Sequence, residues 1–169
     1  TRHPERASWK TLVPEGKDKL EQATVVDNRF LLSYLKDAKT EVRVCDLQGK
    51  AIRTVDLPGI GTAFGFQGKR KDKETFYSFT SFISPTTVYR YEPATGKSSV
   101  FRQPKVGFDA SQYETKQVFY NSKDGTRVPM FLTYKKGLKL DGQNPTLLYA
   151  YGGFDISLTP SFSIPTIVW

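Results

Sequence analysis

Residues 41–57 read EVRVCDLQGKAIRTVDL, and this stretch decides the fold. Apolar and polar residues alternate on both sides of Gly49-Lys50, which indicates two antiparallel strands joined by a tight turn. The same arrangement returns in residues 86–103, TTVYRYEPATGKSSVFRQ, where Gly96-Lys97 takes the place of Gly49-Lys50. The spacing predicts a repeat of about 45 residues.

Two further strands are expected before each of these pairs. In the first repeat they are ATVV (23–26) and FLLSYL (30–35), and in the second TAFGF (62–66) and ETFYSFTSF (74–82). Four antiparallel strands per repeat at this period are typical of β-propeller blades, whereas the alternative is a small β-sandwich. Because two blades cannot close a ring, we expect further blades upstream of Thr1 and a chain that is part of a longer protein.

A different kind of sequence begins after residues 107–111, which we interpret as a linker. Residues 113–122 and 127–136 predict two strands, joined by a turn at Asp124-Gly125 that is a strong hairpin signal. The stretch PTLLYAYGGF (145–154) follows, and its short apolar run predicts a strand buried on both faces. Antiparallel strands that lead into such a strand and a Gly-Gly turn resemble the opening of an α/β-hydrolase sheet.

The end of this last strand is the candidate site. Gly152 and Gly153 are expected to form a structural turn, because glycine adopts backbone dihedrals closed to other residues. Tyr151 and Phe154 would then face one cavity at the strand end, where the sites of parallel sheets collect. The alternative is that both are ordinary core aromatics beside a tight turn.

Several kinds of chemistry are missing from the sequence. It contains no G-x-S-x-G nucleophile elbow, and its single histidine is His3, so it cannot hold a Ser-His-Asp triad. Cys45 is the only cysteine, which excludes an internal disulfide and a cysteine-rich metal site, and we expect it to be buried. We expect no metal, because Asp and Glu are scattered without the close spacing of a metal-binding loop. We expect no cofactor, and dinucleotide binding in particular is disfavoured because the glycines of residues 59–65 precede no helix pattern.

The net charge is +8, from 25 Lys and Arg against 17 Asp and Glu. The positive residues are spread over the whole chain, and the one dense run, residues 69–73, is interpreted as a solvated turn. We therefore expect no nucleic-acid partner. No apolar segment of about 18 residues occurs, so no membrane partner is expected. One cysteine and no visible signal favour a cytoplasmic protein, while a missing N-terminus leaves export open.

Residues 113–163 resemble the corresponding region of prolyl oligopeptidases, the serine peptidases that cut short peptides after proline. The likeness extends upstream through FYSFTSFISP (76–85) and FDASQY (108–113), so it covers nearly all of the chain. It implies a mainly β chain that forms the last blades of a seven-bladed β-propeller and the first strands of an α/β-hydrolase domain. The implied division is blades in 1–108, linker in 109–112 and hydrolase domain in 113–169, with the catalytic triad downstream of Trp169.

The resemblance also implies roles at the candidate site. Tyr151 resembles the tyrosine whose hydroxyl, with a backbone N–H beside the nucleophile, holds the oxyanion of the tetrahedral intermediate. Phe154 resembles an aromatic wall of the proline pocket, and a rigid aromatic face suits the flat, apolar proline ring. Ala150 departs from the glycine more often found before that tyrosine.

The implied partners are short proline-containing peptides and the remaining portions of the same parent protein. A second function stays open at this point. The chain would then belong to a non-catalytic β-propeller interaction module, in which the hydrolase-like tail is only a scaffold.

Overall fold

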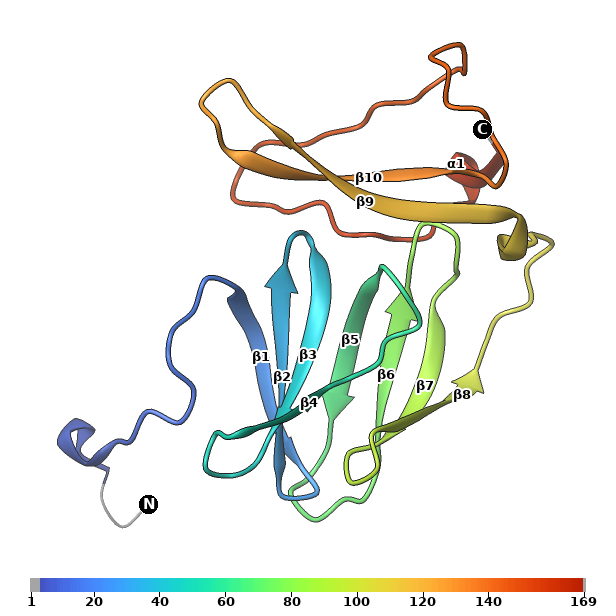
Figure 1. The fold of residues 1–169 in the computed structure, drawn as a ribbon. Helices are drawn as coiled ribbons and strands as arrows, with labels where there is room; N and C mark the ends of the chain where they lie inside the picture. Colours follow the sequence, from blue (N-terminus) through green and yellow to red (C-terminus); the bar gives the residue numbers. More distant parts are fainter. Residues whose placement is uncertain (1–3, 169) are drawn as a thin grey trace.

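The computed structural model describes residues 4–168 and consists mostly of strands. Two four-stranded antiparallel sheets stand side by side, and a two-stranded hairpin lies across one end of both (Figure 1). We call the sheets blade A and blade B. Blade A contains β1 (Lys19–Val26), β2 (Arg29–Lys36), β3 (Lys39–Cys45) and β4 (Ala51–Thr54). Blade B contains β5 (Thr62–Gln67), β6 (Thr75–Thr80), β7 (Thr87–Glu92) and β8 (Lys97–Arg102). The hairpin is β9 (Tyr113–Asn121) with β10 (Arg127–Lys135).

Each blade is an up-and-down meander whose strands pair in chain order, as the repeat predicted. Gly49 and Gly96 close the matching turns between the third and fourth strands, with φ of 84° and 81°. The Gly49 N–H donates to the Asp46 carbonyl at 3.0 Å and the Gly96 N–H donates to the Glu92 carbonyl at 2.8 Å. Glycine suits both positions because other residues adopt positive φ at a cost. The predicted strands and turns of the repeat are confirmed.

The hydrophobic core lies between the two blades. Its buried members are Val26, Leu31, Val42, Val44, Val55, Ala63, Phe66, Tyr77, Phe79 and Tyr91. A bulge in β5, where the pairing shifts between Gly65 and Gln67, turns Phe66 onto the same face as Ala63. The Phe66 ring then stacks on Tyr77 at 4.6 Å between centroids. Cys45 is buried on the other face of blade A, as expected.

Side-chain hydrogen bonds hold the neighbouring strands β1 and β5 together. The Gln22 amide donates to the Gly65 carbonyl and the Thr24 hydroxyl donates to the Phe66 carbonyl, both at 2.8 Å. Both acceptors sit at the bulge, where the β5 ladder is interrupted. The bulge therefore also supplies carbonyls for the contact between the blades.

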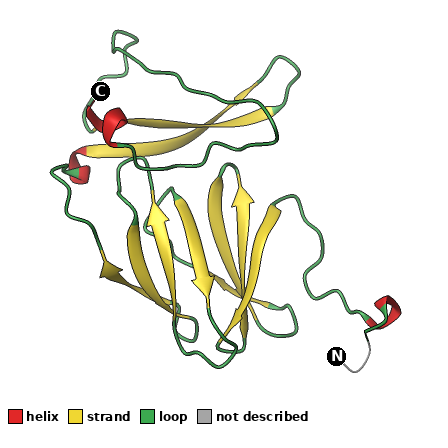
Figure 2. Cartoon of the chain, turned by 180° about the vertical axis from the view of Figure 1, so that it is seen from behind, coloured by secondary structure: helices red, strands yellow, loops and turns green. Residues whose placement is uncertain are grey.

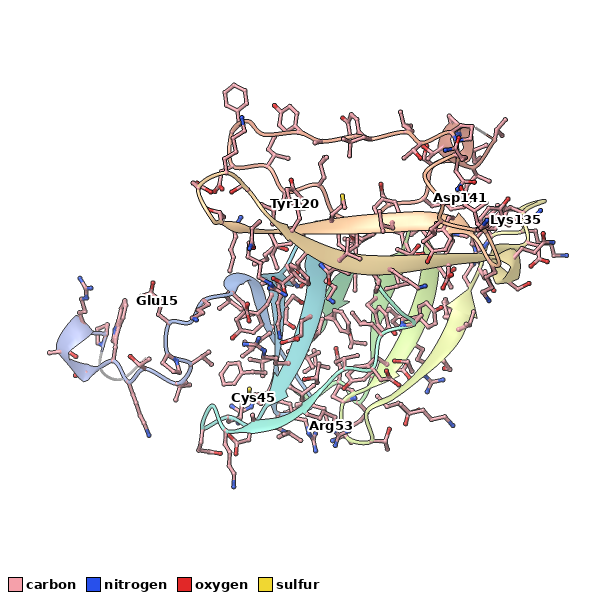
Figure 3. All side chains as sticks on the ribbon, turned by 45° about the horizontal axis from the view of Figure 1, so that its top comes forward. Glu15, Cys45, Arg53, Tyr120, Lys135 and Asp141 are labelled. Atoms are coloured by element: carbon pink, nitrogen blue, oxygen red, sulfur yellow. The ribbon has the colours of Figure 1, made fainter. Side chains whose placement is uncertain are left out.

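The hairpin rests on the blade ends. Its predicted turn is confirmed at Gly125, whose φ is 82° and whose N–H donates to the Ser122 carbonyl at 2.9 Å. Phe82, in the loop after β6, packs against Phe131 of β10 with centroids 5.6 Å apart. The labelled Cys45 and Arg53 of blade A lie away from the hairpin that carries Tyr120 and Lys135 (Figure 3). Two 3-10 turns, η1 (Arg6–Ser8) and η2 (Ala110–Gln112), and the short helix α1 (Ile164–Val168) complete the described chain.

The strand predicted within residues 145–154 is wrong for this structure. The segment is an extended coil (Figure 2), and the side chains of Leu147, Leu148 and Tyr149 are 60%, 79% and 74% exposed. Within residues 4–168 the hairpin sheet holds only β9 and β10, so this apolar run has no strand to pair with. A strand buried on both faces needs hydrogen-bonded neighbours and covering layers, and neither is present here.

Candidate functional site

The predicted site residues form a tight turn in the coil that follows β10. The Ile156 N–H donates to the Gly153 carbonyl at 3.1 Å. Phe154 and Asp155, the two central residues, have φ of 53° and 55°, the pattern of a type I′ turn. A turn of this kind is usually built from glycine, asparagine or aspartate, so Phe154 is an unusual and strained occupant.

This geometry corrects one expectation. Gly152 precedes the turn and Gly153 is its first residue, but the positive φ values belong to Phe154 and Asp155. A Cβ at position 153 would lie 3.2 Å from the Tyr151 hydroxyl oxygen, a close contact that a small shift of this half-exposed side chain would relieve. Tyr151 thus folds back over Gly153.

Tyr151 and Phe154 are close in the chain but do not share a cavity in this structure. The Tyr151 side chain is 46% exposed and Phe154 is 92% exposed. Both aromatics therefore present their surfaces to solvent, and the alternative that they are ordinary core residues is wrong here. An exposed phenol can donate a hydrogen bond to a ligand, and an exposed ring can cover an apolar group.

The coil returns from this turn and runs between the hairpin and the ends of the blades (Figure 1). The Thr62 hydroxyl donates to the Pro160 carbonyl at 2.7 Å, and the Phe162 N–H donates to the Thr80 hydroxyl oxygen at 3.2 Å. Pro160 is fully buried. The coil that carries the candidate site is therefore attached to blade B close to α1.

Aromatic side chains pack together where the coil is attached to blade B. The ring of Phe108, which precedes η2, lies 6.1 Å from Phe162 and 5.0 Å from Tyr113, measured between centroids. The side chain of Asp109 caps η2 by accepting from the Ser111 N–H at 3.0 Å. The segment that connects blade B to the hairpin thus packs against the coil around Phe162.

A hollow of about 270 Å³ lies beside this junction. It is lined by Pro58, Gly59, Ile60, Phe79, Ser81, Ile83, Ser84, Ala110 and Thr115. The lining comes from the loop before β5, from β6 and the loop after it, and from the chain around η2 and β9. Blade B and the hairpin therefore leave a mainly apolar space between them.

An ion cluster occupies the ends of the blades that lie away from the hairpin. The buried carboxylate of Asp27 accepts from the Arg29 guanidinium and from Lys73 Nζ, the latter at 2.7 Å. The hydrogen bond from Lys73 is the main reason that the pKa of Asp27 lies below its usual value, and burial partly opposes it. Asn28 donates its N–H to the Arg70 carbonyl at 3.0 Å. The basic run at 69–73 is solvated, as expected, and it also forms hydrogen bonds with the β1–β2 turn.

Other chemistry is limited in the part of the chain that the structure describes. Among residues 4–168, no group of three or more His, Cys, Asp or Glu side chains lies close enough to hold a metal ion. Burial raises the pKa of the Cys45 thiol, which makes it a poor nucleophile. His3, whose isolation argued against a triad, lies outside the described residues. No described helix is long and apolar enough to cross a membrane.

Sequence reasoning did not identify Thr62 and Thr80 as residues that contact the site loop. Their partners lie 98 and 82 positions away, and single threonines in strands carry no local signal for such contacts. The same holds for the Asp27–Lys73 ion pair, because the sequences of the two turns that it joins give no sign that they are in contact.

A comparison with protein families matches residues 1–104 to the family described as prolyl oligopeptidase, N-terminal β-propeller domain. This match confirms that blades A and B are propeller blades and removes the β-sandwich alternative.

Curated proteins extend the similarity to nearly the whole chain. A prolyl endopeptidase of Elizabethkingia meningoseptica is 46% identical over 99% of this chain, and one of Dictyostelium discoideum is 36% identical over 96%. The chain spans only 24% and 22% of these two proteins. It therefore corresponds to about a quarter of the length of its relatives.

Solved structures agree with the sequence comparison. A chain from a structural and mechanistic study of two prolyl endopeptidases superposes with a TM-score of 0.87 at 45% identity, covering 99% of this chain and 25% of that one. The apo structure of prolyl oligopeptidase B from Galerina marginata gives 0.78 at 32% identity, covering 90% and 22%. The arrangement of blades, hairpin and coil is thus shared with proteins of known structure.

Proposed function

Because the chain belongs to the prolyl oligopeptidase family, we propose that it is part of a serine endopeptidase that cuts short peptides on the carboxyl side of proline. The observation that carries this proposal is the 46% identity to a prolyl endopeptidase over 99% of the chain. A match of that extent necessarily includes the Tyr151–Phe154 turn.

Tyr151 is the proposed oxyanion donor. Its phenol is half exposed, so a ligand can reach the hydroxyl. It lies beside a turn that is closed by a backbone hydrogen bond. A donor fixed before the reaction needs no reorganisation when negative charge develops on the substrate oxygen. The nucleophile, acid and histidine would come from downstream of Trp169.

Phe154 is the proposed wall of the proline pocket. Its ring is 92% exposed, at a turn position whose φ is positive. Leaving so large an apolar surface in water is unfavourable, which supports the view that a further surface covers it when the peptidase is complete.

The division into 1–108, 109–112 and 113–169 is part of the same proposal. The family match to residue 104 and the turn η2 (Ala110–Gln112) support it. The partners would be short proline-containing peptides, and the compartment the cytoplasm.

The test uses the full-length protein, meaning the gene product that contains this chain. Its sequence beyond Trp169 should contain a serine in a glycine-rich elbow, then an aspartate and a histidine. The purified protein should hydrolyse a short peptide with proline at the cleaved position much faster than matched peptides with alanine or lysine there. A serine-directed phosphonate should abolish the hydrolysis. No hydrolysis of any of the three peptides would favour a non-catalytic propeller module.

A further inference from the structure

Two threonine hydroxyls of blade B hold the coil that leads away from the candidate site. Thr62 lies at the start of β5 and binds the Pro160 carbonyl at 2.7 Å, while Thr80 at the end of β6 binds the Phe162 N–H at 3.2 Å. Thr80 is 7% exposed. Both contacts are therefore specific hydrogen bonds from the blade to the backbone of the coil, with at least one of them shielded from water.

The hydroxyl of Thr80 has a defined orientation. It donates to the Ser84 carbonyl at 3.3 Å and accepts from the Phe162 N–H. A hydroxyl has one proton, so this donation leaves a lone pair for Phe162. Valine has nearly the same shape as threonine, but at this position it would leave the Phe162 N–H and one acceptor site of Ser84 unpaired.

The attachment limits where the site can lie. Pro160 lies six positions after Phe154, and six residues of fully extended chain span about 20 Å. No regular secondary structure occupies the stretch between them. The turn therefore lies within about 20 Å of the point where blade B holds Pro160.

We propose that Thr62 and Thr80 are positioning residues for the peptidase reaction, an inference that rests on the proposed function. They fix the backbone at Pro160 and Phe162 to blade B and thereby hold Tyr151 where it can donate to the substrate oxygen. The propeller then contributes to the geometry of the reaction through two hydroxyls, in addition to any contact with the peptide itself.

The attachment can be tested by hydrogen exchange in the full-length protein. Thr62→Val and Thr80→Val are compared with Thr87→Val, which removes a hydroxyl of the same blade that donates to the Pro85 carbonyl at 3.1 Å. Thr87 is 1% exposed, so the control also alters a buried site. The amides of residues 156–159 and 161–163 should exchange roughly tenfold faster in the first two variants than in the control. Equal exchange in all three would overturn the attachment.

The positioning role is tested by kinetics with a proline peptide. Each of the two valine variants should lower kcat by roughly five- to fiftyfold with little change in KM, because small displacements of a reacting group have large effects. Thr62→Ser and Thr80→Ser, which keep the hydroxyl, should retain wild-type kcat, and so should Thr87→Val. In a Tyr151→Phe background, Thr80→Val should lower kcat by less than about twofold, because its effect passes through the lost hydroxyl.

The outcomes distinguish the positioning role of Thr62 and Thr80 from the proposed peptidase function. Proline cleavage with wild-type kcat in Thr62→Val and Thr80→Val would overturn the positioning role alone. A full effect of Thr80→Val in the Tyr151→Phe background would do the same. Absence of proline cleavage in the wild-type protein would overturn the proposed function, and the positioning role with it.

Discussion

Gln117 of β9 and Lys39 of β3 join the hairpin to blade A through a hydrogen bond of 2.6 Å from Lys39 Nζ to the Gln117 side-chain carbonyl. The amide end of the same side chain donates to the Asp37 backbone carbonyl, also at 2.6 Å. One glutamine thus binds both sides of the tight β2–β3 turn, whose residues Asp37 and Ala38 have positive φ. The contact connects the hairpin to blade A, as Thr62 and Thr80 connect the coil to blade B.

Replacing Gln117 by leucine should loosen the hairpin on blade A. Both hydrogen bonds are lost, but water can reach their partners, so the expected loss in unfolding free energy is only about 1 kcal/mol. The measurement is the urea midpoint of the full-length protein, together with hydrogen exchange in residues 113–121. Gln143→Leu, the same change in an exposed loop, is the control. Identical exchange in the two variants would show that Gln117 does not hold the hairpin.

The ion cluster at Asp27 predicts a pH dependence. The folded pKa of Asp27 is lowered, chiefly by the hydrogen bond from Lys73, so its carboxylate stabilises the fold above the unfolded value of about 3.9. That contribution is lost as the pH falls through the lower, folded pKa. Asparagine also tolerates the positive φ of this position, which makes Asp27→Asn a clean substitution.

Asp27→Asn should lower the unfolding free energy of the full-length protein at pH 7 by about 1–2 kcal/mol, because Lys73 is largely exposed and its charge is screened. The difference from wild type should shrink between pH 5 and pH 2. Denaturant titrations across this range provide the measurement, with Asp141→Asn in an exposed loop as the control. A difference that stays constant with pH would mean that the ionisation of Asp27 contributes nothing.

Much of the fold could be predicted because its signals are local. The strands of both blades alternate apolar and polar residues, and Gly49, Gly96 and Gly125 mark turns within a few residues of the strands that they join. The bulge that turns Phe66 into the core has only an ambiguous local signal, the glycine at position 65 within the strand. Nothing in the alternation of β5 indicates that Phe66 shares a face with Ala63.

The candidate site was less predictable for two physical reasons. The apolar run at 147–150 was interpreted as a strand, but a strand depends on neighbours that the described chain does not contain. The positive φ of Phe154 runs against the preference of that residue, so the sequence indicates a turn at the adjacent glycines but not which residues adopt the unusual dihedrals. The contacts of Thr62 and Thr80 join positions far apart in the chain and could only come from the structure.

Phe154→Ala should reduce discrimination in favour of proline by about 1–3 kcal/mol, the range that one apolar pocket contact supplies. The measurement is the ratio of kcat/KM for matched peptides with proline or alanine at the cleaved position, in the full-length protein. Ile156→Ala, a truncation two residues further along the same coil, is the control and should leave the ratio unchanged. If the ratio is also unchanged in Phe154→Ala while both rates fall, Phe154 braces the turn and is no pocket wall.

The proposed role of Tyr151 is tested most directly by the rate of the chemical step in Tyr151→Phe, measured in single-turnover experiments with a proline peptide. The substitution keeps the ring that lies over Gly153 and removes only the donor hydroxyl. We expect this rate to fall roughly a hundredfold to a thousandfold, about 2.7–4 kcal/mol in barrier, with a much smaller change in substrate binding. A single-turnover rate equal to that of the wild-type protein would contradict it.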